Sequence, residues 1–365
     1  MPGSVRLSIL ISVAAALSQS GPAKKDDQAK VAEIINAVRD HEQLYRNISF
    51  ECEETLETLR PADVKVDPRW FQSAKYQSRL VLQKELVFYD QTQQGASGNG
   101  PFDFGFRLAY DGEKLRDLTH SVHKGKKGDV GHIATGLQPK LPAPLTPQQM
   151  GCRLGDNSLS EYLDGSHLKK LSRPVVQENV YQGEESVDGL QCVKILMLLK
   201  SKSPDGKDQV DKQVIWISPE RSYLPVKSET FVAPFVDSPF VTMHASDFRE
   251  VQPGIYVPFR GEKVNYSKRK DGSTVPGSRT ISIVKAVDLN PNYPLSYFQD
   301  VPFPPGALIY VQKGDNIVMS YTQQAPDVAP PSFFVRWWRG LVILAAVIVA
   351  CACVAIVIVY RRRIA

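Results

Sequence analysis

The stretch that decides the fold is NVYQGEESVDGLQCVKILMLLK, residues 179–200. Two runs rich in apolar residues flank Asp188-Gly189, and an Asp-Gly pair between such runs is a strong hairpin signal. The next segment, DKQVIWISPERSYLPVKSETF (residues 211–231), repeats this pattern with a turn at Ser218 to Ser222. Both segments therefore predict long antiparallel hairpins.

Two more segments continue the series. VTMHASDFREVQPGIYVPFRGEKVNYS (residues 241–267) turns near Pro253-Gly254, and STVPGSRTISIVKAVDLN (residues 273–290) supplies the last long strand. No helix pattern interrupts these segments, so a parallel sheet with crossover helices is excluded. We therefore predict an α+β fold that is mainly β: a strongly curved antiparallel sheet, or half-barrel, with helices packed on it. After Pro304-Pro305-Gly306, residues 307–322 predict one further small hairpin.

The N-terminal part of the chain predicts an amphipathic helix that can cover one face of the sheet. Over residues 29–45, Val31, Ile34, Ile35 and Val38 recur at helical spacing and form an apolar stripe. Residues 47–59 alternate apolar and polar side chains, which is typical of a strand with one wet face. The helix is expected to lie against this sheet.

The middle of the chain predicts alternating strands and loops. Residues 78–90 predict one strand, 91–103 a Gly-rich loop, and 104–122 a hairpin that turns at Asp111-Gly112. Residues 124–149 are basic and then rich in Gly and Pro, which predicts a long loop. Ser158 with Glu161 forms a capping-box pattern, which predicts a short helix over 158–165.

Both ends of the chain carry targeting signals. Arg6, the apolar run from Leu7 to Leu17 and the small residues Ser18 and Ser20 predict a signal peptide; an uncleaved signal anchor is the alternative. GLVILAAVIVACACVAIVIVY, residues 340–360, is uncharged and about 30 Å long as a helix, which predicts one membrane span. Two tryptophans precede the span and three arginines follow it.

These signals place the middle of the chain outside the cytoplasm and the C-terminus inside. The expected parts are a signal peptide (1–20), a flexible N-terminus (21–28), an extracytoplasmic domain (29–322), a Pro-rich tether (323–335), a transmembrane helix with its interfacial flank (336–360) and a cytoplasmic tail (361–365). Five cysteines, two of them inside the span, are few for an exported protein, which favours a bacterial envelope. The net charge of +5 predicts no nucleic-acid role.

Several segments resemble the lipoprotein-sorting proteins of the LolA, LolB and RseB-like type, in a planctomycete-like, membrane-anchored form. The resemblance covers about residues 29–311 and rests on AEIINAVRDHEQLYRNISFECEETL (32–56), YDGEKL (110–115), VIWISPERSYLPVKSE (214–229), ASDFREVQPGIYVPFRGE (245–262) and VDLNPNYPLSYFQDVPFPPGALIYV (287–311). It implies a half-barrel closed by helices. Those relatives lack a membrane span, so the resemblance leaves a docked role open and puts a shuttle role in doubt.

No residue pattern predicts catalysis. His120, His123 and His132 lie close in sequence, but lysines surround them, so a solvated basic loop is favoured over a metal site. Neither a catalytic residue nor a cofactor is predicted, and the protein is not expected to be an enzyme. Lys124, Lys126 and Lys127 are candidate contacts for lipid head groups. Small residues in the span, Ala346 and Ala350, permit a homodimer through the transmembrane helix.

The apolar faces of the predicted strands carry the functional hypothesis. If the helices leave the sheet partly uncovered, its apolar residues form a groove for a lipid or an acylated protein; otherwise they form a filled core. The candidate groove residues are Ile48, Phe50, Leu80, Leu82, Ile195, Leu196, Ile215, Ile217 and Ile283. The alternative hypothesis is a sensor or interaction subunit that recognises a protein partner.

Overall fold

The computed structural model describes residues 25–59, 71–97, 100–123, 126–139, 146–152, 154–155, 157–170, 174–202, 206–314 and 316–324. The predicted signal peptide, the predicted membrane span and the cytoplasmic tail lie outside these residues. Within the described ranges, no helix has both the length and the apolar character needed to cross a bilayer.

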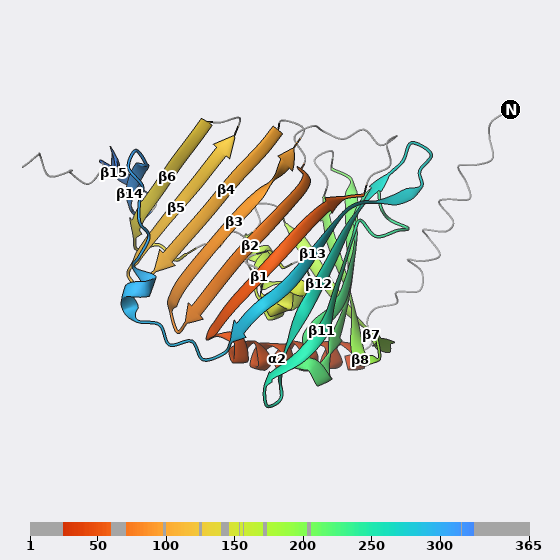
Figure 1. Cartoon of the computed structure of the whole chain (residues 1–365). Coiled ribbons are helices and arrows are strands. Elements are labelled where there is room, and N and C mark those ends of the chain that lie inside the picture. Colours follow the sequence, from red (N-terminus) through yellow and green to blue (C-terminus); the bar gives the residue numbers. More distant parts are fainter. Residues whose placement is uncertain are drawn as a thin grey trace, which may run out of the picture.

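One strongly curved, open sheet of 15 strands forms the body of the protein (Figure 1). Its order is β15-β14-β6-β5-β4-β3-β2-β1-β13-β12-β11-β10-β9-β8-β7. On one side of the central strand β1 (Ile48–Thr58) lie β2 (Phe71–Gln83), β3 (Leu86–Ser97), β4 (Gly100–Tyr110), β5 (Lys114–His123) and β6 (Lys126–Thr135). On the other side lie β7 (Val175–Val187), β8 (Leu190–Lys202), β9 (Asp208–Ser218), β10 (Leu224–Phe231), β11 (Val241–Gln252), β12 (Ile255–Lys268) and β13 (Thr274–Asp288).

The two halves of the sheet join where β13 pairs with β1. The chain runs outward from β1 to β6, crosses to the far edge at β7 and returns strand by strand until Asp288 lies opposite Ser49. The described residues of the segment that makes this crossing, residues 136–174, include three short helices. The chain therefore places helices across the sheet between its two halves.

Five of the described helices lie on one face of the sheet, which we call the inner face. They are α2 (Lys25–Glu42), η1 (Gln43–Tyr45), η2 (Pro147–Met150), α3 (Leu159–Asp164) and η3 (Ser166–Lys170). Ile34 and Val38 of α2 and Leu159 and Leu163 of α3 pack against the inner side chains of β8 and β9. This confirms the amphipathic helix, which begins at Lys25, so residues 25–28 are helical.

The opposite, outer face is covered by a shorter segment. The helix η5 (Leu295–Phe298) buries Phe298 against Val81, Phe88 and Ala109 of β2, β3 and β4. The chain then forms β14 (Leu308–Lys313) and β15 (Asn316–Thr322) at the far edge. β14 pairs with β6 in parallel, whereas every other pairing is antiparallel. The last hairpin is thus confirmed, but its parallel partner was not predicted.

The hairpins at Asp111-Gly112, Asp188-Gly189, Ser218–Ser222 and Pro253-Gly254 and the capping box at Ser158 are confirmed. The prediction of a single strand over residues 78–90 was wrong, because the chain turns at Lys84-Glu85 and forms two strands. Lys84 takes a positive φ of 57° there without any of the usual turn residues.

Two predicted loops contain strands. Residues 91–103 belong largely to β3 and β4, which pair from Val87–Tyr110 to Ser97–Gly100. Gly95 permits this, because a Cβ there would lie 2.8 Å from the ring of Phe102. Residues 124–149, also predicted as loop, contain β6, which pairs with β5 over its whole length. Pairing with neighbouring strands outweighs local composition in both segments.

Gly151 marks a place where the crossing segment packs closely against the sheet. A Cβ at Gly151 would overlap the carbonyl oxygen of Pro225 on β10 and lie 2.7 Å from its carbonyl carbon. Gly151→Ala is therefore expected to lower the melting temperature by several degrees, because backbone must move. Gly105→Ala is the control, since its Cβ would make only ordinary contacts, 3.6 Å from Cβ of His120. Equal melting temperatures for the two variants would contradict this packing.

Candidate ligand-binding groove

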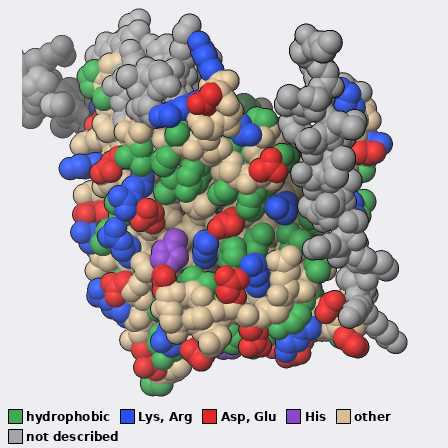
Figure 2. All heavy atoms as spheres, turned by 90° about the vertical axis from the view of Figure 1, so that its right-hand side faces the viewer, with side chains coloured by type: hydrophobic (Ala, Val, Ile, Leu, Met, Phe, Trp, Pro, Cys, Tyr) green, Lys and Arg blue, Asp and Glu red, His purple; other side chains and the backbone are tan. Residues whose placement is uncertain are grey.

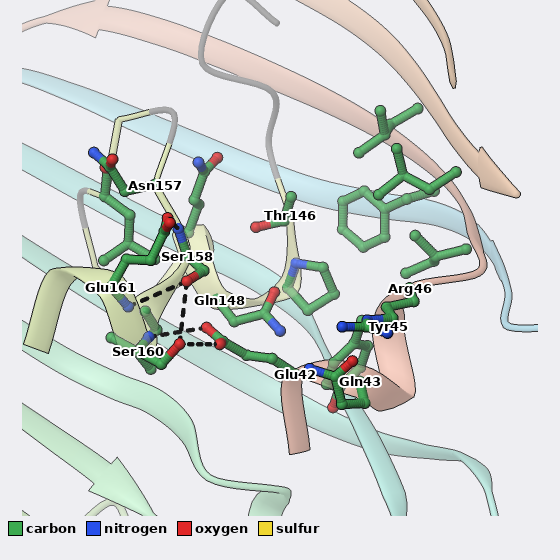
Figure 3. Close-up of a pocket in the computed structure, with 18 of the residues that line it drawn as sticks. Glu42, Gln43, Tyr45, Arg46, Thr146, Gln148, Asn157, Ser158, Ser160 and Glu161 are labelled. Carbon is green, nitrogen blue, oxygen red and sulfur yellow. Dashed lines mark hydrogen bonds between the residues drawn. The ribbon is translucent and has the colours of Figure 1, made fainter. Parts of the chain in front are cut away.

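A cavity of about 1040 Å³ opens on the inner face, between the sheet and the helices. We call it the groove (Figure 3). Its floor comes from β1 and β2, one wall from the end of α2 with η1, and the other wall from η2 and the start of α3. The lining residues include Arg39, Glu42, Gln43, Tyr45, Arg46, Ile48, Phe50, Leu80, Leu82, Pro139, Thr146, Gln148, Gln149, Ser158, Ser160 and Glu161.

The floor of the groove is apolar. Ile48 lies opposite Leu82 and Phe50 opposite Leu80 in the β1–β2 pairing, so all four side chains share the inner face. Ile48, Phe50 and Leu80 are 1 to 2% exposed, and Leu82 is half-buried. The floor is thus apolar and lies on a rigid sheet, and Leu82 is its partly exposed side chain.

The rim of the groove is polar. Arg46 and Gln43 are exposed where the chain leaves η1, and Gln148 and Gln149 are half-buried on the opposite wall. In Figure 3 Gln43 and Arg46 lie beside η1, and Gln148 lies on the side of the opposite wall. An apolar floor with a few polar groups at the mouth is the usual composition of a small-molecule site.

Glu42 ties the two walls together. Its carboxylate accepts hydrogen bonds from the backbone N–H of Ser160 (3.0 Å) and from the Ser160 hydroxyl (2.5 Å) at the start of α3. Burial raises the pKa of Glu42, although the bonds from Ser160 favour the charged form. Arg39 adds an outer contact at 3.1 Å to Asp164, at the end of α3. These contacts hold α2 and α3 at a fixed separation.

The structure divides the candidate groove residues into three groups. Ile48, Phe50, Leu80 and Leu82 line the groove. Ile195, Ile215 and Ile217 are 0% exposed in a filled core beneath α2 and α3. Leu196 packs with Trp216 in a different cluster, and Ile283 lies opposite Glu53, on the outer face. Only the first group is near the cavity.

Two of the candidate head-group lysines, Lys126 and Lys127, lie at the start of β6. Lys127 is 62% exposed and lies 3.6 Å from Asp129. Lys126 begins β6, and Lys124 lies outside the described residues. Lys127 is not part of the groove lining.

The two described histidine rings at this end are on opposite faces. His120 Nδ1 lies 2.5 Å from Asp129, whereas His132 Nδ1 lies 2.8 Å from Asp117 and its ring stacks on Tyr310. Desolvation raises the pKa of Asp117. Over the described part of the chain, no group of three potential ligands could hold a metal ion.

The sequence did not indicate the second wall of the groove. Thr146, Gln148 and Ser160 lie in a segment whose periodicity shows a short helix but not the strands that it faces. The capping box at Ser158 locates the start of α3, and only the bond from Ser160 to Glu42 directs that start toward α2. No local signal encodes a contact between residues so far apart.

The bond between Glu42 and Ser160 yields a stability prediction. Glu42→Ala leaves two buried donors without their acceptor, which costs about 1–3 kcal/mol of unfolding free energy. Glu42→Gln keeps an acceptor oxygen at the same place and is expected to lose much less. Thermal unfolding of both variants at neutral pH measures the difference, and an unchanged midpoint for Glu42→Ala would rule out the tie.

The raised pKa of Glu42 predicts that the stability difference between the wild type and Glu42→Gln depends on pH. A folded-state pKa above the ordinary value of 4.5 adds stability at lower pH, and this contribution is lost as the pH rises through the folded pKa. Gln at position 42 does not titrate. As the pH rises from below 4.5 through the folded-state pKa of Glu42, the wild type loses this contribution and Glu42→Gln does not. The melting temperature of Glu42→Gln relative to that of the wild type is therefore expected to rise with pH over this range.

No protein-family model and no curated protein matches the chain. Among solved structures, it is similar to a DUF1329 family protein from Desulfovibrio piger, at 13% identity and a TM-score of 0.37, with 73% of this chain and 96% of that chain covered. It is also similar to a putative outer membrane lipoprotein-sorting protein domain from Vibrio parahaemolyticus (8% identity, TM-score 0.34, 73% and 97% covered). A third is the lipoprotein LppX from Mycobacterium tuberculosis (12% identity, TM-score 0.27, 71% and 94% covered).

The Vibrio parahaemolyticus domain is of the kind that the sequence resemblance named. All three TM-scores are below 0.5, so the function is argued from the groove of this chain alone.

Proposed function

We propose that this protein binds an apolar ligand, a lipid or the acylated tail of a lipoprotein, in the groove, without covalent chemistry. The observation that carries the proposal is the apolar floor of a cavity of about 1040 Å³ on the inner face. This volume is at the upper end of the roughly 300–1,000 Å³ typical of ligand pockets. It therefore suits a long, flexible ligand better than a small polar one.

Burial of methylene groups against the floor supplies the affinity. Each buried CH₂ contributes about 0.8 kcal/mol, so a ligand gains with every carbon that packs against the apolar floor beside the half-buried Leu82. The polar groups of the rim then contact the polar end of the ligand. Arg46 and Gln43 on one wall and Gln148 on the other remain available to solvent at the mouth. This arrangement orients an amphiphile with its chain inward.

The location is part of the proposal. A signal peptide over residues 1–20 and a membrane span over residues 340–360 would hold the sheet on the outer side of a bacterial cell membrane. The extracytoplasmic domain would cover residues 29–322, with the Pro-rich tether between it and the span. The protein would then receive its ligand at the membrane where lipids and acylated proteins reside.

Ligand content is the direct test. The exported part, residues 21–329, is purified from cell envelopes, and native mass spectrometry is followed by solvent extraction. A bound lipid or lipopeptide is the expected result and would identify the ligand. A mass equal to the bare chain, unchanged after incubation with envelope lipids, would refute the proposal and favour recognition of a protein partner.

A pair of leucine substitutions tests the place of binding. Leu82→Asp puts a charge on the groove floor and is expected to weaken binding of a fluorescent fatty acid by roughly 10- to 100-fold, because a buried leucine contributes about 1.5–3 kcal/mol. Leu295→Asp is the matched control, since Leu295 is 52% exposed on η5, at the outer face. Melting curves check that both variants fold. Equal affinities for the two variants would place the ligand elsewhere.

A further inference from the structure

The hairpin of β14 and β15 exposes an unusual amount of apolar surface. Half of the large hydrophobic side chains that are exposed in the described residues lie on these two strands: Leu308 (36%), Ile317 (58%), Val318 (62%), Met319 (54%) and Tyr321 (38%). All seven residues of β15 are exposed, on both faces of the strand. Clustered exposed apolar side chains mark a contact surface, whereas scattered ones do not.

The edge formed by β15 also lacks charge. Sheet edges are commonly protected by charged residues, and the opposite edge strand β7 has Glu178, Glu184 and Glu185. The side of the molecule that carries β7 has acidic and basic side chains spread over it (Figure 2). β15, in contrast, reads Asn-Ile-Val-Met-Ser-Tyr-Thr. Exposure of the apolar side chains of this strand to water is therefore unfavourable.

The position of the hairpin in the chain indicates what contacts it. Trp337 follows Thr322 by 15 residues, which is about 50 Å even when fully extended, and the uncharged run of residues 340–360 begins shortly after. Of the described residues, β15 is the strand nearest in sequence to this run. A bilayer that holds the run is thus within reach of the hairpin.

The geometry of β15 favours a bilayer over a second copy of the chain. The β14–β15 register shifts between Val311 and Gln312, so that Val318 is skipped in the pairing. Such a bulge twists an edge strand and disfavours its extension by another strand. A lipid surface needs no strand register and accepts apolar side chains from both faces.

We propose that the β14–β15 hairpin docks on the surface of the bilayer, with Ile317, Val318 and Met319 inserted among the lipids. Interfacial segments bury their apolar side chains about 5–10 Å deep. Tyr321 supplies an amphipathic ring at the interface, and the exposed Lys313 at the hairpin turn reaches lipid phosphates. This inference rests on the membrane anchoring in the proposed function, and it fixes one edge of the sheet at the membrane.

The test uses the full chain in vesicles of phosphatidylcholine and phosphatidylglycerol that contain nitroxide-labelled lipids. Cys351 and Cys353 are changed to Ser, and Met319→Cys carries a fluorophore; Cys52, Cys152 and Cys192 are at most 2% exposed and do not react. Val176→Cys is the control, because Val176 is 64% exposed on β7, the other edge. The label at position 319 is expected to be quenched by nitroxide lipids several-fold more than the label at 176.

Equal quenching at the two positions overturns the docking proposal. Quenching at position 319 by a second labelled copy, without quenching by lipid, would overturn it in favour of a dimer. A fluorophore at Tyr321→Cys gives an independent check, because Ile317→Ser with Val318→Ser is expected to reduce its quenching by lipid. Fatty-acid binding in the same vesicles reports on the groove, so loss of docking with binding retained would leave the proposed function intact.

Discussion

The pairing of β1 with β13 is the constraint on which the rest of the structure depends. Ser49 opposite Asp288 and Thr58 opposite Ser278 join two sets of strands that are far apart in sequence. Without this pairing, the strands from β1 to β6 and those from β7 to β13 would form two separate sheets. With it, the inner face is continuous, and one helical layer can cover part of both halves.

The same helical layer fills one half of the inner face and leaves a cavity over the other. α2 has 18 residues, about 27 Å, and with α3 it buries the apolar side chains of β8 and β9. η1 then turns the chain into β1, where the Tyr45 hydroxyl donates to the Tyr256 carbonyl at 2.6 Å. Because Glu42 holds α3 against this end of α2, a cavity remains over β1 and β2, where Leu82 is the partly exposed side chain of the floor. The hydrogen bonds between Glu42 and Ser160 therefore help to position the walls of the groove.

Local patterns predicted most of the strands and the helix but misjudged the turns that lack a turn signal. Asp188-Gly189 and Pro253-Gly254 mark hairpins because few residues adopt a positive φ readily, and both glycines do so. Lys84 adopts the same conformation without such a residue, so the β2–β3 turn was missed. The glycine-rich composition around Gly95 and Gly100 suggested a loop, although β3 and β4 include these two residues and pair there.

Local sequence patterns were enough to predict the curved antiparallel sheet, the amphipathic helix and the apolar face of the strands, because a two-residue period and hairpin turns are local properties. It could not separate Phe50 from Ile195, since both are apolar residues at alternating positions in strands. The difference arises in the folded protein, where Ile195 is buried beneath α2 and α3 and Phe50 lines a cavity. The reason is that the position of a helix on a sheet depends on contacts such as Glu42 with Ser160, between residues distant in the chain.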